Sequence, residues 1–111
     1  MIKTLISNID ELNIDKEEIK KHADLLAKGK TVIFPTETVY GLGANALDEE
    51  AVKKIYEAKG RPSDNPLIVH IYNENEINSL ATDISEQAKK LMDEFWPGPL
   101  TMIFKKKDIV P

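Results

Sequence analysis

The sequence predicts an α/β or α+β fold, in which helices pack against a β-sheet. Apolar residues recur at helical spacing in several segments, and short runs of β-branched and aromatic residues stand between these segments. The connections are short, and the chain contains no repeat, low-complexity tract or evident linker. A chain of 111 residues fits one domain at most. We therefore expect helices and strands that alternate along a single domain.

Two helices in the first half of the chain are predicted from their end residues. Asp15 is a good N-cap, and Gly29 is a suitable stop for the helix that follows it. Asp48 starts the second helix, where two glutamates in the first turn favour the helix dipole, and Gly60 ends it. Both segments carry apolar side chains at i, i+3 and i+4, which predicts amphipathic helices.

Three strands and two more helices complete the predicted fold. Each strand is a compact apolar run, and the last helix carries an apolar stripe on one face. The strands are expected at residues 31–35, 66–71 and 100–104, and the helices at residues 74–81 and 85–95. The chain stops shortly after the last of these strands. We therefore expect a domain that is incomplete at its C-terminal end.

Composition and charge narrow the class of protein. The apolar share of 41% and the charged share of 31% are typical of a soluble globular domain. No apolar run approaches the roughly 20 residues that a membrane-spanning helix needs, and the first residues do not resemble a signal peptide. Cysteine is absent, which excludes disulfides and thiolate zinc sites, and the net charge of −4 argues against general coating of nucleic acid. We expect a cytoplasmic protein without a membrane partner.

The first candidate site is the polar segment of residues 35–43, which reads PTETVYGLG. It leaves the predicted strand at 31–35 with two threonine hydroxyls, a carboxylate and a phenol close together. Gly41 and Gly43 permit positive φ and close approach of the backbone, and ligands of open sheets bind beyond strand ends. An ordinary strand-to-helix loop explains the same residues equally well. The segment is not a P-loop, because no Gly-Lys-Ser/Thr follows.

The second candidate site is the segment of residues 59–66, which reads KGRPSDNP, together with His70. Lys59 ends a predicted helix, and Arg61 is the single arginine among 15 basic residues. A lysine point charge beside a planar guanidinium suits a phosphate chain, and Asn65 can both donate and accept. A solvated turn is the alternative explanation. A lone histidine in an apolar strand is more often a packed core residue than a ligand.

Other kinds of chemistry find no support in the sequence. No carboxylate pair or histidine cluster has the spacing of metal ligands, so we predict no metal site made by the protein. No nucleophile elbow is visible. The available groups are hydroxyls, amides and cations, which suit catalysis by positioning and charge stabilisation, as in phosphoryl or nucleotidyl transfer.

Three ordered motifs stand out in the sequence. They are FPTETVYGLGAN at residues 34–45, KGRP and NPLIVH within residues 59–70, and WPGPLT at residues 96–101. Together they resemble the motifs of the YrdC/Sua5 family of threonylcarbamoyl-AMP synthases. The resemblance covers nearly the whole chain beyond about residue 25. It implies a YrdC-like twisted mixed sheet flanked by helices, and residues 1–111 would be the N-terminal part of a single YrdC-like domain.

This resemblance implies a nucleotidyltransferase of tRNA t6A modification. Its substrates would be L-threonine, bicarbonate or CO2, and ATP, and its products would be threonylcarbamoyl-AMP and pyrophosphate. Mg2+ would arrive with the nucleotide. A downstream enzyme would then transfer the threonylcarbamoyl group to tRNA. Weak binding of tRNA or double-stranded RNA is implied only loosely.

The resemblance also implies roles for individual residues, carried over by their positions in the motifs. Lys59 and Arg61 would be the catalytic cations that stabilise charge on the reacting phosphorus and on the leaving pyrophosphate. The residues implied are Thr38 and His70 for L-threonine, Lys59, Arg61 and Asn65 for ATP, and Thr36 and Tyr40 for the pocket lining.

The family domain continues beyond the length of this chain, with an arginine-bearing strand and an S-x-N motif that complete its site. We therefore expect the 111 residues to be truncated and inactive in synthesis by themselves. One alternative is the related carbamoyl-adenylating domain of hydrogenase maturation, which lies in long chains with cysteine-rich zinc modules. Another is a non-catalytic RNA- or nucleotide-binding module. The absence of cysteine disfavours the first, and the acidic balance disfavours the second.

Overall fold

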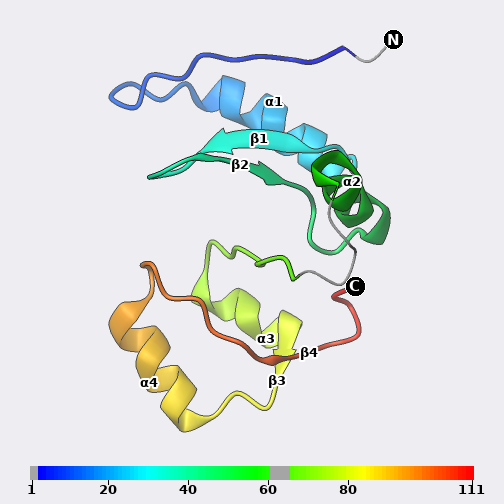
Figure 1. Ribbon diagram of the computed structural model, residues 1–111. Helices are drawn as coiled ribbons and strands as arrows, with labels where there is room; N and C mark the ends of the chain where they lie inside the picture. The colour runs from blue at the N-terminus through cyan, green and yellow to red at the C-terminus, as the bar shows by residue number, and fades with distance from the viewer. Residues whose placement is uncertain (1–2, 61–65) are drawn as a thin grey trace. The chain divides into compact units, whose positions relative to one another are not determined.

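The computed structural model describes residues 3–60 and 66–111, which belong to two compact units (Figure 1). The first unit is Met1–Gly60 and the second is Arg61–Pro111. Within the described residues both units are mixtures of helices and small antiparallel sheets, which agrees with the predicted α/β class. No helix in these two stretches is long and apolar enough to cross a membrane.

The first helix forms where its cap predicts it. α1 (Lys16–Ala27) follows Asp15, whose carboxylate accepts hydrogen bonds from the N–H groups of Glu17 and Glu18 at 3.0 and 3.3 Å. These bonds satisfy donors that the first turn of a helix leaves without a partner. Gly29 adopts a φ of 83°, the left-handed conformation in which glycine commonly ends helices. Both predicted ends are confirmed.

The second predicted helix is also confirmed, and it is tied to the end of the first. α2 (Glu49–Lys59) begins after its cap Asp48 and ends at Gly60, whose φ is 65°. A Cβ placed on Gly29 would lie 2.9 Å from the Asp48 carboxylate, so this glycine allows the two helix ends to approach. The Lys54 ammonium donates to the Gly29 carbonyl at 2.9 Å.

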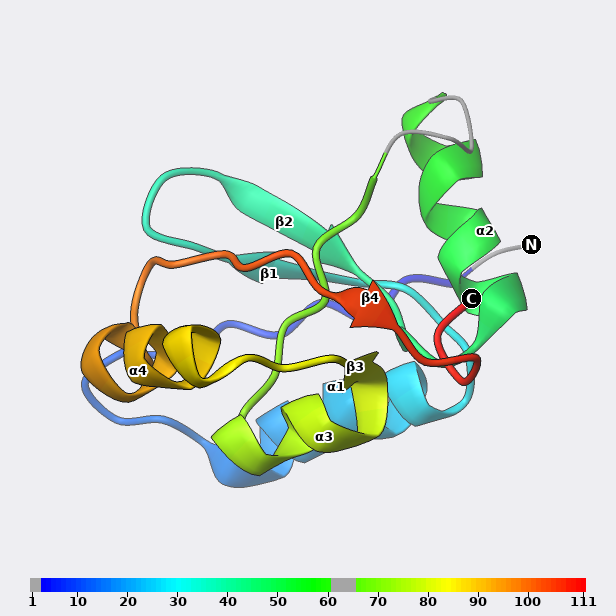
Figure 2. The same ribbon diagram turned by 90° about the horizontal axis from the view of Figure 1, so that it is seen from below.

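Between these helices the chain forms a β-hairpin rather than a strand-to-helix loop. β1 (Val32–Pro35) pairs antiparallel with β2 (Tyr40–Gly43), and α1 lies beside β1 (Figures 1 and 2). The local sequence predicts β1 but not β2. The predicted burial of the first strand is wrong, because Ile33 is 68% exposed and Phe34 is 38% exposed. A two-stranded hairpin has too few neighbours to bury both of its faces.

The second unit contains the two helices predicted for it. Ser85 caps the longer helix, and its hydroxyl accepts a hydrogen bond from the Ala88 N–H at 3.0 Å. The short helix predicted at 74–81 begins as a 3-10 turn and ends at Leu80, and Ala81 already belongs to a strand. The elements of this unit are η1 (Glu74–Glu76), α3 (Ile77–Leu80), β3 (Ala81–Thr82), α4 (Glu86–Phe95) and β4 (Lys105–Lys106).

Two strand predictions in the second unit are wrong. Residues 66–71 have no regular secondary structure, and the strand expected at 100–104 is replaced by β4, which begins at Lys105 and pairs with β3. Ile68 is 60% exposed and Ile103 is 96% exposed. An apolar run becomes a strand only when a neighbouring strand pairs with its backbone, and no strand in the described part of this unit pairs with either run.

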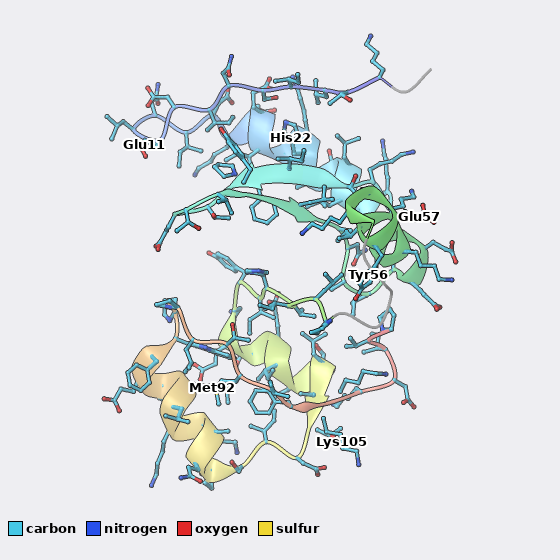
Figure 3. All side chains as sticks on the ribbon, viewed as in Figure 1. Glu11, His22, Tyr56, Glu57, Met92 and Lys105 are labelled. Atoms are coloured by element: carbon cyan, nitrogen blue, oxygen red, sulfur yellow. The ribbon has the colours of Figure 1, made fainter. Side chains whose placement is uncertain are left out.

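The described residues bury few apolar side chains. Ala51 and Ile55 of α2 are buried in the first unit, and Ala81 and Met92 are buried in the second. Met92 comes from α4 (Figure 3). Because a fully buried large apolar side chain contributes only about 1.5–3 kcal/mol, cores of this size stabilise each unit weakly. We therefore expect single substitutions to have visible effects on unfolding.

One such effect concerns Glu74 at the start of η1. Partial loss of water, a hydrogen bond with Asp93 of α4 and the like charge of Asp93 together raise the pKa of the Glu74 carboxyl. The folded unit therefore holds this proton more tightly than the unfolded chain does. The stability that protonated Glu74 contributes is fully present below the pKa that this carboxyl has in the unfolded chain. It is lost as the pH rises through the higher pKa that the carboxyl has in the folded unit. Replacing Glu74→Gln should raise the urea midpoint at pH 7 slightly and leave it nearly unchanged at pH 4.

Glu86→Gln is the matched control, because Glu86 lies in the first turn of α4 and pairs with Lys89 at 3.2 Å. That change removes a favourable exposed charge, so it should not raise the midpoint. Equal midpoints for wild type and Glu74→Gln at both pH values would contradict the pairing of Glu74 with Asp93.

Candidate functional site

The hairpin brings three of the predicted site residues together. Pro35 lies opposite Tyr40, so the turn consists of the four residues between them. Thr36 begins this turn, Thr38 lies within it and Tyr40 begins β2. Thr38 is exposed, and Tyr40 is 75% exposed. The turn therefore presents a hydroxyl and a phenol to solvent on a hydrogen-bonded scaffold.

The Thr36 side chain is part of that scaffold. Its hydroxyl donates to the Val39 carbonyl and accepts hydrogen bonds from the N–H groups of Thr38 and Val39 at 3.4 and 3.2 Å. The Thr36 N–H donates to the same Val39 carbonyl at 3.2 Å. Threonine and serine commonly stabilise turns in this way. Its predicted role as a pocket-lining residue stays a prediction.

The two glycines of β2 make room for an aromatic ring. A Cβ on Gly41 would lie 3.0 Å from Cζ of Phe34, and a Cβ on Gly43 would lie 2.8 Å from its Cε1. Among the described glycines, those with positive φ are Gly29 and Gly60. Gly41 and Gly43 therefore do not use the positive φ that glycine permits. Their missing Cβ atoms instead leave room for the Phe34 ring.

The other predicted site residues lie elsewhere along the chain. Lys59 is exposed at the C-terminal end of α2, where helix carbonyls favour a cation. His70 belongs to the second unit and is exposed, so the alternative of a packed core histidine is wrong. Arg61 and Asn65 lie outside the described residues. The described residues contain no group of three or more His, Cys, Asp and Glu side chains that could hold a metal ion.

A polar cluster that the sequence analysis did not predict holds the N-terminal segment to α1. The Ser7 hydroxyl donates to Glu18 at 2.8 Å and lies 2.9 Å from Nε2 of His22. Figure 3 labels His22 on α1. The hydrogen bonds from Lys21 and from Ser7 lower the pKa of the Glu18 carboxyl. Because the single Ser7 proton goes to Glu18, the His22 ring must donate to Ser7. His22 is therefore not a base for Ser7, and the cluster is a structural tether.

The sequence contains no local signal that predicts this cluster. Glu18 and His22 are four residues apart on one helix face, which is an ordinary helical spacing. Ser7 lies 11 residues before Glu18, and no local pattern joins them.

The second unit adds an apolar hollow and a lysine-rich strand. Leu91, Phe95, Pro99 and Leu100 line the hollow, which contains none of the predicted site residues. At the C-terminal end of the chain, the Lys106 and Lys107 ammonium groups donate to backbone carbonyls of Val110 and Asn78. These two lysines therefore donate to backbone carbonyls of their own unit.

The fold, the hairpin turn and the ordered motifs define the class of protein: the chain belongs to the Sua5/YciO/YrdC family. The model of this family, described as "Telomere recombination", matches residues 24–111. The match covers most of the chain, including both strands of the hairpin and the whole second unit.

Relatives within this family show what the chain is homologous to. It is 55% identical over 108 residues to the threonylcarbamoyl-AMP synthase of Pyrococcus abyssi. These aligned residues cover 97% of this chain and 32% of the relative. It is 57% identical over 98 residues to the threonylcarbamoyl-AMP synthase of Bacillus subtilis, covering 88% of this chain and 28% of the relative. A putative threonylcarbamoyl-AMP synthase of Methanocaldococcus jannaschii is 46% identical over 114 residues. This protein is therefore a homologue of threonylcarbamoyl-AMP synthases.

Solved structures agree with this assignment. The crystal structure of P. abyssi Sua5 complexed with L-threonine matches with a TM-score of 0.91 and 55% identity over 97% of this chain. A doubly substituted P. abyssi Sua5 matches with a TM-score of 0.85. The chain spans about a third of the length of the P. abyssi and B. subtilis relatives.

Proposed function

We propose that this chain supplies part of the L-threonine and ATP sites of a threonylcarbamoyl-AMP synthase that acts in tRNA t6A modification. The observation that carries the proposal is the match to the P. abyssi structure complexed with L-threonine, with a TM-score of 0.91 at 55% identity. The motifs at residues 34–45 and 59–70 supply hydroxyl, amide and cationic groups of the kind that such substrates require.

In the proposed reaction the amine of L-threonine is carboxylated by bicarbonate or CO2. An oxygen of the resulting carbamate attacks the α-phosphate of ATP, a carbamate–phosphate bond forms, and the bond to the β-phosphate breaks to release pyrophosphate. ATP enters as its Mg2+ complex, and the ion is part of the substrate. The product, threonylcarbamoyl-AMP, would pass to a downstream enzyme that transfers its threonylcarbamoyl group to tRNA.

The proposed roles divide between the two motifs. Thr38, presented by the hairpin turn, would bind L-threonine, and His70 is proposed for the same ligand. Lys59 and Arg61 would stabilise negative charge on the triphosphate as the bond to pyrophosphate breaks, and Asn65 would bind the nucleotide. Tyr40 would line the pocket beside Thr38. Catalysis would thus come from positioning and electrostatics, without a protein nucleophile.

The wider domain implied by this proposal is a twisted mixed sheet flanked by helices. Residues 1–111 would form the N-terminal part of that single YrdC-like domain, in a cytoplasmic protein. The relatives supply the support for this reading, since their sequences are about three times as long as the matched segment.

The experiment that tests the function uses a chimera in which this chain replaces the matching third of the P. abyssi synthase. Pyrophosphate release that depends on ATP, L-threonine and bicarbonate is expected from the chimera. Release close to background is expected from the 111-residue chain alone. Omitting L-threonine from the chimera assay controls for simple ATP hydrolysis. A folded chimera that releases no pyrophosphate would count against the proposed function.

Thr38→Val in this chimera tests the proposed threonine site. Valine keeps the shape of threonine and removes the exposed hydroxyl, so the KM for L-threonine should rise roughly fivefold to tenfold, as expected for a lost hydrogen bond of about 1 kcal/mol. The KM for ATP should stay within about twofold of wild type, because the change removes no group assigned to ATP.

Thr38→Ser keeps the hydroxyl and should restore most of the affinity for L-threonine. An unchanged KM for L-threonine in Thr38→Val would remove Thr38 from the site.

A further inference from the structure

The hydrogen-bonding capacity of the Thr36 hydroxyl is fully used inside the turn. A threonine hydroxyl offers one proton and two lone pairs. The proton goes to the Val39 carbonyl, and the lone pairs accept from the N–H groups of Thr38 and Val39 at 3.4 and 3.2 Å. No donor or acceptor remains on this side chain for a substrate.

The rest of the Thr36 side chain is also placed by the hairpin. A Cβ on Gly41 would lie 3.6 Å from the Thr36 methyl carbon, which is ordinary van der Waals contact. The methyl group therefore faces β2, and the hydroxyl faces the turn. The backbone N–H of Thr36 adds a bond to the Val39 carbonyl at 3.2 Å.

Thr36 and Thr38 are both exposed, but they differ in hydrogen bonding. None of the hydrogen bonds among residues 3–60 and 66–111 uses the Thr38 hydroxyl. The backbone N–H of Thr38 is held by the Thr36 hydroxyl at 3.4 Å. The two threonines of the turn therefore have different roles. Thr36 closes the turn, and Thr38 presents a hydroxyl that no hydrogen bond of the described residues uses.

We propose that Thr36 is a positioning residue for L-threonine binding, which acts through Thr38 and does not contact the amino acid. This inference rests on the proposed function for the assignment of Thr38 to L-threonine. It replaces the expectation that Thr36 lines the pocket. A misplacement of a binding hydroxyl by about 1 Å is enough to weaken binding strongly, so a residue that fixes the turn controls affinity without touching the ligand.

The first test measures amide hydrogen exchange by NMR in the 111-residue chain. Thr36→Val removes the hydroxyl and keeps the shape, so the amides of Thr38 and Val39 should exchange roughly fivefold faster or more, as expected for a lost hydrogen bond of about 1 kcal/mol. Thr36→Ser keeps the hydroxyl and should exchange at nearly the wild-type rate. Exchange at the wild-type rate in Thr36→Val would overturn the proposal.

The second test measures KM values in the chimera with the P. abyssi synthase. Thr36→Val should raise the KM for L-threonine roughly fivefold and leave the KM for ATP unchanged, while Thr36→Ser should behave like wild type. In a Thr38→Val background, Thr36→Val should raise the KM for L-threonine little further, because both changes remove the same interaction.

The outcomes separate positioning from direct contact. A raised KM for L-threonine without faster exchange at Thr38 and Val39 would mean that the Thr36 hydroxyl contacts the amino acid, and it would overturn the proposal. Additive effects of Thr36→Val and Thr38→Val would do the same. A wild-type chimera without pyrophosphate release would instead count against the proposed function, and amide exchange would still decide whether Thr36 holds the turn.

Discussion

Arg61→Ala should lower kcat/KM for ATP in the chimera roughly 100- to 1,000-fold, the loss typical for removing a group that stabilises transition-state charge. Arg61 is the single arginine of the chain and belongs to the KGRP motif. Its guanidinium offers a planar fork that matches two phosphate oxygens, and no neighbouring residue type in the motif can replace that geometry. Initial rates of pyrophosphate release over a range of ATP concentrations measure the effect.

Arg61→Lys is the matched control for this prediction. Lysine keeps the positive charge and loses the bidentate fork, so its activity should lie between wild type and Arg61→Ala. Both variants should unfold at the urea midpoint of wild type, because the proposed role is in phosphate binding rather than in the fold. Near wild-type turnover of Arg61→Ala at low ATP would show that the phosphate assignment is wrong.

Gly43→Ala should destabilise the 111-residue chain by about 1–3 kcal/mol, the range found when atoms are added to a filled site. The new Cβ would lie 2.8 Å from Cε1 of Phe34, a separation that side chains do not tolerate. Either the ring leaves the face of the hairpin or the pairing of β1 with β2 loosens. Urea unfolding followed by circular dichroism measures the free energy, and amide exchange at Leu42 reports on the hairpin itself.

A double-mutant cycle with Phe34→Leu isolates the cause. Leucine lacks the ring atoms that the new Cβ would meet, so Gly43→Ala should cost much less in that background. Gly41→Ala should have a smaller effect than Gly43→Ala, because its Cβ would lie 3.0 Å from the ring. Equal costs of Gly43→Ala with and without the Phe34 ring would show that the ring is not the reason for this glycine.

Local signals predicted the helices well. Asp15 and Asp48 cap α1 and α2 because a short acceptor side chain satisfies the first free N–H groups of any helix that follows it. Gly29 and Gly60 end these helices because glycine adopts positive φ without a steric penalty. Each of these effects involves residues that are a few positions apart, so the sequence by itself contains the information.

Strands were predicted less well than helices. A strand depends on hydrogen bonds with a neighbouring strand, and the local sequence does not specify which segment that neighbour is. β2 contains two glycines, which lower the strand propensity, and it forms because β1 pairs with it and Phe34 covers both glycines. The run at 66–71 has a strand-like composition, yet no neighbouring backbone in the described residues pairs with it. Apolar composition thus indicates where a strand is able to form, and pairing decides where it does.

The candidate site shows the same difference between local sequence signals and tertiary contacts. The sequence by itself determined the family, through the order and spacing of three motifs, and it determined the helix ends, because both kinds of information are local and additive along the chain. Only the tertiary structure decided three other features. Gly41 and Gly43 make room for the Phe34 ring, and Ser7 hydrogen-bonds to α1. The Thr36 hydroxyl uses all of its hydrogen bonds within its own turn. The physical reason is that a hydrogen bond or a close contact depends on distance and direction in space, and residue type alone specifies neither.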